Sequence, residues 1–137
     1  MKIGLDIMGG DYAPHSTLPG ALLASKQLST DEKIVLIGDS NVAKEILQQN
    51  NAELSLFEFI HADDQIAMNE HATKAIRKKP NNSISVGFEA LKNGEIDVFS
   101  SAGNSGAMLV GSMFSVGPIK GVIRPCITSV LPKENGS

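Results

Sequence analysis

Five short apolar runs rich in β-branched residues alternate along the chain with longer segments whose apolar residues recur at helical spacing. The runs cover residues 2–7, 33–37, 54–60, 96–99 and 126–131. Most are almost continuously apolar, which is typical of strands buried on both faces in a parallel sheet. Because parallel strands need crossover connections, and these are right-handed, the alternation predicts an open, doubly wound α/β sheet of mostly parallel strands.

The intervening segments supply the helices. Pro14 suits the first turn of one helix, and Asp39 or Ser40 can cap a second. A third helix is expected to begin near Ser83 and a fourth around Ser105. In sheets of this kind ligands bind beyond the carboxyl ends of the strands, so the loops that follow strands are the places to search for a site.

The composition sets limits on function. With 137 residues, 42% hydrophobic and 20% charged, the chain amounts to about one globular domain. Its net charge of −3 gives no global case for nucleic acid or an anionic membrane. The single cysteine, Cys126, excludes an internal disulfide, no Cys/His spacing resembles a zinc site, and a reducing cytoplasm is the simplest setting. Cys126 lies in an apolar run, so we expect a buried, inert thiol.

The first unusual loop is "LDIMGGDYAP", directly after the first expected strand. Gly9 and Gly10 allow positive φ and a close approach of a ligand to the main chain. Neither a dinucleotide fingerprint nor a phosphate-binding P-loop is present. The flanking carboxylates, Asp6 and Asp11, would repel a phosphate, so they could orient loop amides, pair with a cation or accept a proton. A tight turn that leads into a helix fits the same residues.

The second is the basic segment in "MNEHATKAIRKKPNNS". On a helix, Lys74, Arg77 and Lys78 share one face, and Lys79 extends it before Pro80 ends the element. These cations could bind an anionic substrate or the acidic surface of a carrier protein. A solvated helix end, with cations near the negative pole of the helix dipole, is the alternative.

The third is the uncharged loop "SSAGNSGAM" between a strand and a helix. Gly103 and Gly106 flank Asn104 and Ser105, so the helix would present free N–H groups together with an amide and a hydroxyl. An anion would meet no repulsive charge there. Ser105 could instead only cap a helix that packs closely on the sheet.

The order and spacing of five motifs resemble the PlsX family of phosphate acyltransferases across essentially the whole chain. The motifs are "IGLDIMGGDYAP", "HADDQIAM", "KAIRKKPNNSI", "SSAGNSGAM" and "IRPCITSVLP". The resemblance implies transfer of a long-chain fatty acyl group from acyl-acyl carrier protein to inorganic phosphate, giving acyl phosphate for phospholipid synthesis. It implies a Rossmann-like α/β/α fold of the phosphate acetyltransferase and isocitrate/isopropylmalate dehydrogenase type, with no organic cofactor and no metal.

The resemblance also implies partners and a domain plan. It implies a cytoplasmic homodimer that associates peripherally with the membrane through segments not in this chain, a downstream glycerol-3-phosphate acyltransferase and no nucleic acid. Residues 1–137 would be the N-terminal part of a single α/β/α domain, without the second lobe, and we expect no activity from these residues alone.

Loop chemistry and resemblance together give a candidate site, in which the 103–106 loop binds phosphate or the acyl oxyanion. One departure from the family pattern is Ser105, which stands where threonine is common and keeps the hydroxyl. Another is Pro80, which interrupts the basic segment. The candidate catalytic residues are Asn104, Ser105, Lys74 and Asp6, and the candidate substrate-binding residues are Gly9, Gly10, Asp11, Arg77, Lys78, Ser83, Gly103, Gly106 and Arg124.

Three weaker readings stay open. A phosphate acetyltransferase-like enzyme that acts on a short-chain acyl-CoA would use the same fold and the same kind of loop. A non-enzymatic nucleotide-binding domain would need an acidic residue after the second strand, where Asp39 lies, but no dinucleotide glycine motif precedes it. His61 and Asp63 could polarise a group near the same sheet edge, although such a pair is more often structural.

Overall fold

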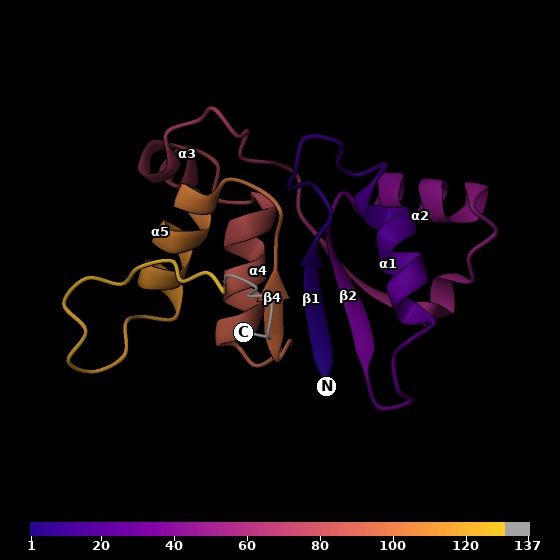
Figure 1. Ribbon diagram of the computed structural model, residues 1–137. Coiled ribbons are helices and arrows are strands. Elements are labelled where there is room, and N and C mark those ends of the chain that lie inside the picture. The colour runs from indigo at the N-terminus through magenta and orange to yellow at the C-terminus, as the bar shows by residue number, and fades with distance from the viewer. Residues whose placement is uncertain (131–137) are drawn as a thin grey trace.

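The computed structural model of the chain describes residues 1–130, in which four strands form one all-parallel sheet (Figure 1). The strand order is β3-β2-β1-β4. This confirms the predicted Rossmann-like α/β fold. The strands are β1 (Lys2–Asp6), β2 (Lys33–Gly38), β3 (Phe57–His61) and β4 (Val98–Ser100). The helices are α1 (Thr17–Ser25), α2 (Ser40–Gln49), the short 3₁₀ helix η1 (Leu54–Leu56), α3 (Ala72–Lys78), α4 (Ser83–Lys92) and α5 (Ser105–Ser115).

Helices cover both faces of the sheet, as Figure 1 shows, with α1 and α2 on one side and α4 on the other. Alternate side chains of β2 contribute to the hydrophobic cores on the two faces of the sheet. Ile34 and Leu36 pack in the core formed with α1 and α2, whereas Val35 and Ile37 pack in the core formed with α4. All four side chains are buried, which accounts for the unbroken apolar run in this strand.

Two helical glycines set the distance between layers on the α4 side. A Cβ added at Gly87 of α4 would overlap the ring of Phe99 in β4, and one added at Gly111 of α5 would lie 2.6 Å from Phe88 of α4. The rings of Phe88 and Phe99 pack edge to face, with centroids 5.1 Å apart. Glycine at these positions therefore lets β4, α4 and α5 stack closely.

Gly87→Ala should lower the free energy of unfolding by about 1–2 kcal/mol, because overpacking against Phe99 outweighs the gain in helix propensity. Gly20→Ala in α1 is the matched control, since nothing lies within 4 Å of the added Cβ. The control should raise stability by about 0.5–1 kcal/mol. Chemical denaturation of both variants measures the difference, and equal effects would contradict the packing described here.

Two strands and one helix begin later than the sequence pattern predicts. Helix α1 begins at Thr17, and Pro14 precedes it, with its carbonyl accepting the N–H of Leu18. Residues 54–56 form η1, so β3 begins only at Phe57. Ile96 is buried in the core but precedes β4, which begins at Val98. Apolar periodicity locates these elements but does not fix their first residue.

The predicted strand at residues 126–131 is wrong for residues 126–130, and Leu131 lies outside the described residues. Residues 126–130 are neither strand nor helix and pair with none of β1 to β4. Cys126 is exposed, not buried as expected. An apolar run forms a strand only where a neighbouring strand accepts its hydrogen bonds, and this requirement is not written in the run itself. None of the helices in residues 1–130 is long and apolar enough to cross a bilayer.

Candidate functional site

The loops that follow β1 and β4 meet at the carboxyl edge of the sheet, because these two strands are neighbours. Gly9 lies against the second loop. A Cβ added there would come within 2.6 Å of Asp6 Oδ2, 2.7 Å of the Gly103 nitrogen and 2.8 Å of Ser101 Oγ. Gly10 has a φ of 109°, which disfavours any side chain. The two glycines thus allow backbone-to-backbone contact between two loops that are far apart in the sequence.

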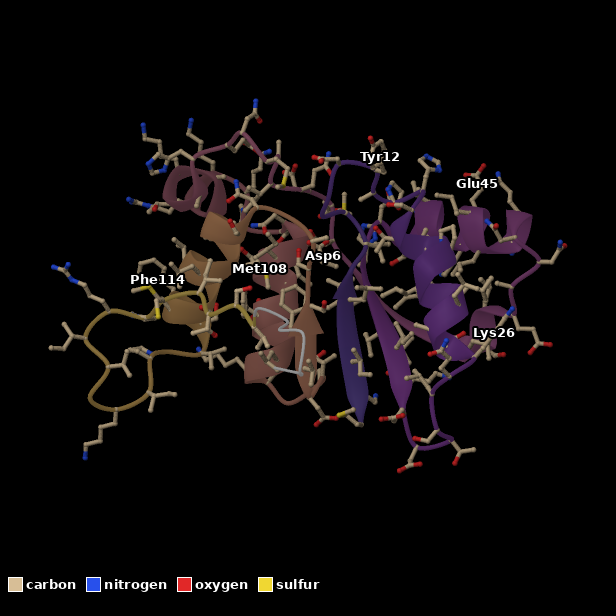
Figure 2. The ribbon with its side chains drawn as sticks, in the orientation of Figure 1. Asp6, Tyr12, Lys26, Glu45, Met108 and Phe114 are labelled. Atoms are coloured by element: carbon tan, nitrogen blue, oxygen red, sulfur yellow. The ribbon has the colours of Figure 1, made fainter. Side chains whose placement is uncertain are left out.

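Asp6 is the polar centre of this contact and is only 1% exposed. It ends β1, close to where β4 leads into α5 (Figure 2). Its Oδ1 accepts the N–H of Met8 at 2.9 Å, and its Oδ2 accepts the hydroxyl of Ser101 at 2.6 Å. Ser101 Oγ in turn accepts the N–H of Gly103 at 3.0 Å. Three roles are predicted for Asp6: to orient loop amides, to pair with a cation or to accept a proton. The observed hydrogen bonds match the first of these roles.

Asn104 is the N-cap of α5 and is 7% exposed. Its Oδ1 accepts the N–H of Ala107 at 3.0 Å, while its Nδ2 donates to the carbonyls of Ala67 at 3.1 Å and Glu70 at 3.0 Å. The cap is therefore Asn104, not Ser105. Because the amide protons of Asn104 already have acceptors, its side chain positions α5 against the 62–71 loop and is not a free donor for a substrate.

The N-terminus of α5 keeps unused donors. The N–H groups of Asn104, Ser105 and Gly106 have no acceptor among residues 1–130. Ser105 is exposed, so its hydroxyl is accessible beside them. Helix N-termini carry a partial positive charge, and an anion placed here would accept several hydrogen bonds at once. Of the predicted catalytic residues, Ser105 is thus the one whose side chain is accessible at the meeting point of the loops.

Lys79 has a structural partner. Its Nζ donates to Glu70 Oε2 and to the carbonyl of Gln65, both at 2.9 Å. Glu70 Oε2 also accepts the N–H of Ala67 at 2.7 Å. The hydrogen bond from the Lys79 ammonium has the largest effect and the one from the Ala67 N–H the next largest, and together they hold the pKa of Glu70 below its usual value. This ion pair therefore fixes the turn at residues 65–70, to which Asn104 also binds.

Glu70→Gln should reduce the protection of the Ala67 amide against hydrogen exchange at neutral pH. The pKa of Glu70 is lower in the folded state than in the unfolded state. The stabilisation that ionised Glu70 gives to the fold is therefore fully present above its unfolded pKa of about 4.3 and is lost as the pH falls through the folded pKa. Wild-type protection should therefore fall as the pH drops through the lowered folded pKa of Glu70, whereas that of Glu70→Gln should not change there. Glu45→Gln, an exposed change on α2, is the control; equal profiles for all three proteins would contradict this role.

Lys74, Arg77 and Lys78 lie on α3, which confirms that this basic segment is helical. The three side chains line a shallow hollow of about 430 Å³, and none of them pairs with a carboxylate within residues 1–130. Arg77 also borders a second hollow of about 420 Å³ between α3 and α5, lined by Thr73, Ile76, Val110 and Phe114. Phe114 is 75% exposed and lies on the outer side of α5 (Figure 2). A basic surface thus adjoins an apolar one.

Ser83 and Arg124 do not join the loops. Ser83 is 2% exposed at the first position of α4, where its N–H donates to the carbonyl of Asp64 at 2.9 Å. Ser83 is therefore part of the packed start of α4. Arg124 is exposed and lines a hollow that consists only of residues from the segment 117–126, which extends away from α5 (Figure 1). The prediction that Arg124 helps to bind the anion is therefore not supported by its position among the described residues.

His61 is the last residue of β3 and Asp63 follows it, two strands away from β1. His61 Nε2 lies 3.0 Å from Asp63 Oδ1, and its Nδ1 accepts the N–H of Ser40 at 3.3 Å. The hydrogen bond from Ser40 requires an Nδ1 without a proton. The ring proton is therefore on Nε2, which donates a hydrogen bond to Asp63. The pair connects the end of β3 to the start of α2, which is a structural role.

The parallel sheet, with its paired loops at the carboxyl edge, places the chain among Rossmann-like α/β proteins with a candidate anion site. Residues 1–137 match the family described as "Fatty acid synthesis protein", and the chain belongs to this family, the PlsX family. It is 43% identical over 136 residues to a protein from Caldicellulosiruptor bescii, 42% identical over 136 residues to one from Pelotomaculum thermopropionicum and 43% identical over 137 residues to one from Caldanaerobacter subterraneus subsp. tengcongensis.

Each of these three relatives is named phosphate acyltransferase. The matches cover 99%, 99% and 100% of this chain but only 40%, 39% and 40% of the respective relatives. The chain thus spans about two fifths of the length of these relatives.

Proposed function

We propose that the intact protein transfers a long-chain fatty acyl group from acyl-acyl carrier protein to inorganic phosphate, forming an acyl phosphate for phospholipid synthesis. The observation that carries this proposal is the uncharged N-terminus of α5, where three adjacent N–H groups and the Ser105 hydroxyl are available to an anion. The names of the relatives support the reaction, and the family resemblance supports the acyl donor.

The proposed chemistry needs no covalent enzyme intermediate. A phosphate oxygen attacks the thioester carbonyl carbon, the carbon–sulfur bond breaks, and the leaving thiolate takes a proton that phosphate loses. The protein holds phosphate next to the thioester and stabilises the oxyanion of the tetrahedral intermediate. N–H groups of residues 104–106 and the Ser105 hydroxyl bind the anion. Lys74, on the helix packed against α5, supplies a cation at its rim.

The basic surface of α3 is the proposed contact for the acyl carrier protein. Lys74, Arg77 and Lys78 lack carboxylate partners among residues 1–130 and would attract an acidic surface. The neighbouring hollow lined by Ile76 and Phe114 would accept apolar groups at the centre of such a contact. A cytoplasmic homodimer with peripheral membrane association belongs to the same proposal and rests on the family resemblance.

The test is whether the intact protein consumes acyl-acyl carrier protein thioester only when phosphate is present. Hydroxylamine, added after the reaction, should trap the acyl phosphate as a hydroxamate. Acyl-CoA of short chain length, offered under the same conditions, is the comparison. Consumption of thioester at the same rate without phosphate would refute acyl transfer to phosphate, and use of acyl-CoA alone would replace the proposed donor.

A further inference from the structure

Ser101 connects the two loops of the candidate site, although no sequence pattern singles it out. It follows β4, and its hydroxyl donates to Asp6 at the end of β1 at a distance of 2.6 Å. The same oxygen accepts the N–H of Gly103 at 3.0 Å. A hydroxyl has one proton and two lone pairs, so the bond to Asp6 fixes the proton and leaves a lone pair for Gly103.

The hydrogen bond between Asp6 and Ser101 is costly to break because Asp6 is buried. Asp6 is 1% exposed, and its two oxygens accept hydrogen bonds from the Met8 N–H in the first loop and from the Ser101 hydroxyl in the second. Hydrogen bonds to a charged group are stronger than neutral ones, and a buried carboxylate that loses a donor keeps an uncompensated charge. The Cα of Gly9 lies against Gly103, so the two loops are also in direct backbone contact. Both loops therefore depend on one carboxylate and one hydroxyl.

We propose that Ser101 is a positioning residue for phosphate, and this inference rests on the proposed function. By binding the Gly103 N–H, Ser101 removes that group from the donors available to an anion and fixes the backbone immediately before α5. The site for the anion then begins at Asn104 and continues through Ser105 and Gly106. The donors are held in place before phosphate arrives, so binding does not have to order the loop.

Ser101→Ala and Ser101→Cys in the intact protein test this role. Cysteine is a weak donor and acceptor and fills the space that alanine would leave empty, so the two variants lose the hydrogen bonds with opposite changes in side-chain volume. Both variants should raise the KM for phosphate by roughly tenfold or more, as expected from loss of a hydrogen bond to a charged group. The KM for the acyl donor should change by less than about twofold, because the proposal assigns Ser101 to the phosphate site and not to the thioester. Ser101→Thr, which keeps the hydroxyl, should restore the phosphate KM.

Ser100→Ala is the matched control. Ser100 is the neighbouring serine, but it lines a groove with Ile3 and Leu5 on the α1 side of the sheet. Its variant should keep the wild-type phosphate KM. A purely structural Ser101 would lower the melting temperature and kcat but leave the phosphate KM unchanged, and that result would overturn the proposal.

Direct titration of the intact protein with inorganic phosphate separates this inference from the proposed function. Phosphate binding that weakens about tenfold in both Ser101 variants supports the positioning role, even if the wild type proves to catalyse a different transfer. Equal binding by wild type and variants overturns the inference and leaves the proposed reaction standing. Absence of binding to the wild type overturns both.

Discussion

Gly9→Ala should reduce phosphate-dependent turnover of the intact protein by about a hundredfold or more. The added methyl group would come within 2.6 Å of Asp6 Oδ2, 2.7 Å of the Gly103 nitrogen and 2.8 Å of Ser101 Oγ. The Gly103 nitrogen is a backbone atom, and Asp6 Oδ2 and Ser101 Oγ are held to each other by a hydrogen bond, so the methyl group must push the β1 and β4 loops apart. Displacement of a substrate-binding loop by about 1 Å is enough for a loss of this size.

Gly20→Ala provides the control for an added methyl group, because the space around Gly20 is open. It should keep wild-type turnover. Steady-state rates at saturating acyl donor, measured across a range of phosphate concentrations, give the comparison. Wild-type turnover by Gly9→Ala would mean that the contact between the two loops has no part in the reaction.

Asn104→Ala should lower phosphate-dependent turnover by tenfold or more and destabilise the protein by about 2 kcal/mol. The change removes the N-cap of α5 and the side-chain donor to the Glu70 carbonyl, and it leaves the Ala67 carbonyl with only the N–H of Glu70. The expected loss of activity arises because α5 is no longer held against the 62–71 loop, and not because a direct donor to the substrate disappears.

Asn104→Asp separates the two functions of this side chain. Aspartate still accepts the Ala107 N–H and caps α5, but it cannot donate to Ala67 and Glu70. It should therefore lose turnover nearly as severely as alanine. Thermal unfolding and turnover of both variants are the measurements, and full activity of Asn104→Asp would limit the role of Asn104 to capping.

Local patterns in the sequence predict much of the fold. The buried run of β2 and the cap of α2 are examples. The sequence predicts Asp39 or Ser40 as this cap, and Asp39 is the residue that accepts the N–H groups of Asn41 at 2.9 Å and Val42 at 3.2 Å. Such features depend on neighbours within a few residues of the chain. Residues 126–130 of the strand predicted at 126–131 do not form a strand, because a strand depends on a distant partner.

The candidate site is predicted only in outline. Asn104 and Ser105 have almost equal preference for an N-cap position, so propensity does not reveal which of them caps α5. Lys74 and Lys79 look equivalent in the sequence, and only the fold shows that Lys79 is bound to Glu70. The pairing of Asp6 with Ser101 spans 95 residues and follows from the adjacency of β1 and β4, which is a property of the sheet order.

Amide chemical shifts of the ¹⁵N-labelled intact protein, followed during titration with inorganic phosphate, test the proposed anion site most directly. The resonances of Asn104, Ser105 and Gly106 should move together and saturate, because their N–H groups have no acceptor in the described part of the chain and can bind an anion. The Gly103 amide should keep its hydrogen bond to Ser101 and shift least of the four. Saturating shifts confined to Lys74, Arg77 and their neighbours on α3, with residues 104–106 unmoved, would contradict the placement of phosphate at the N-terminus of α5.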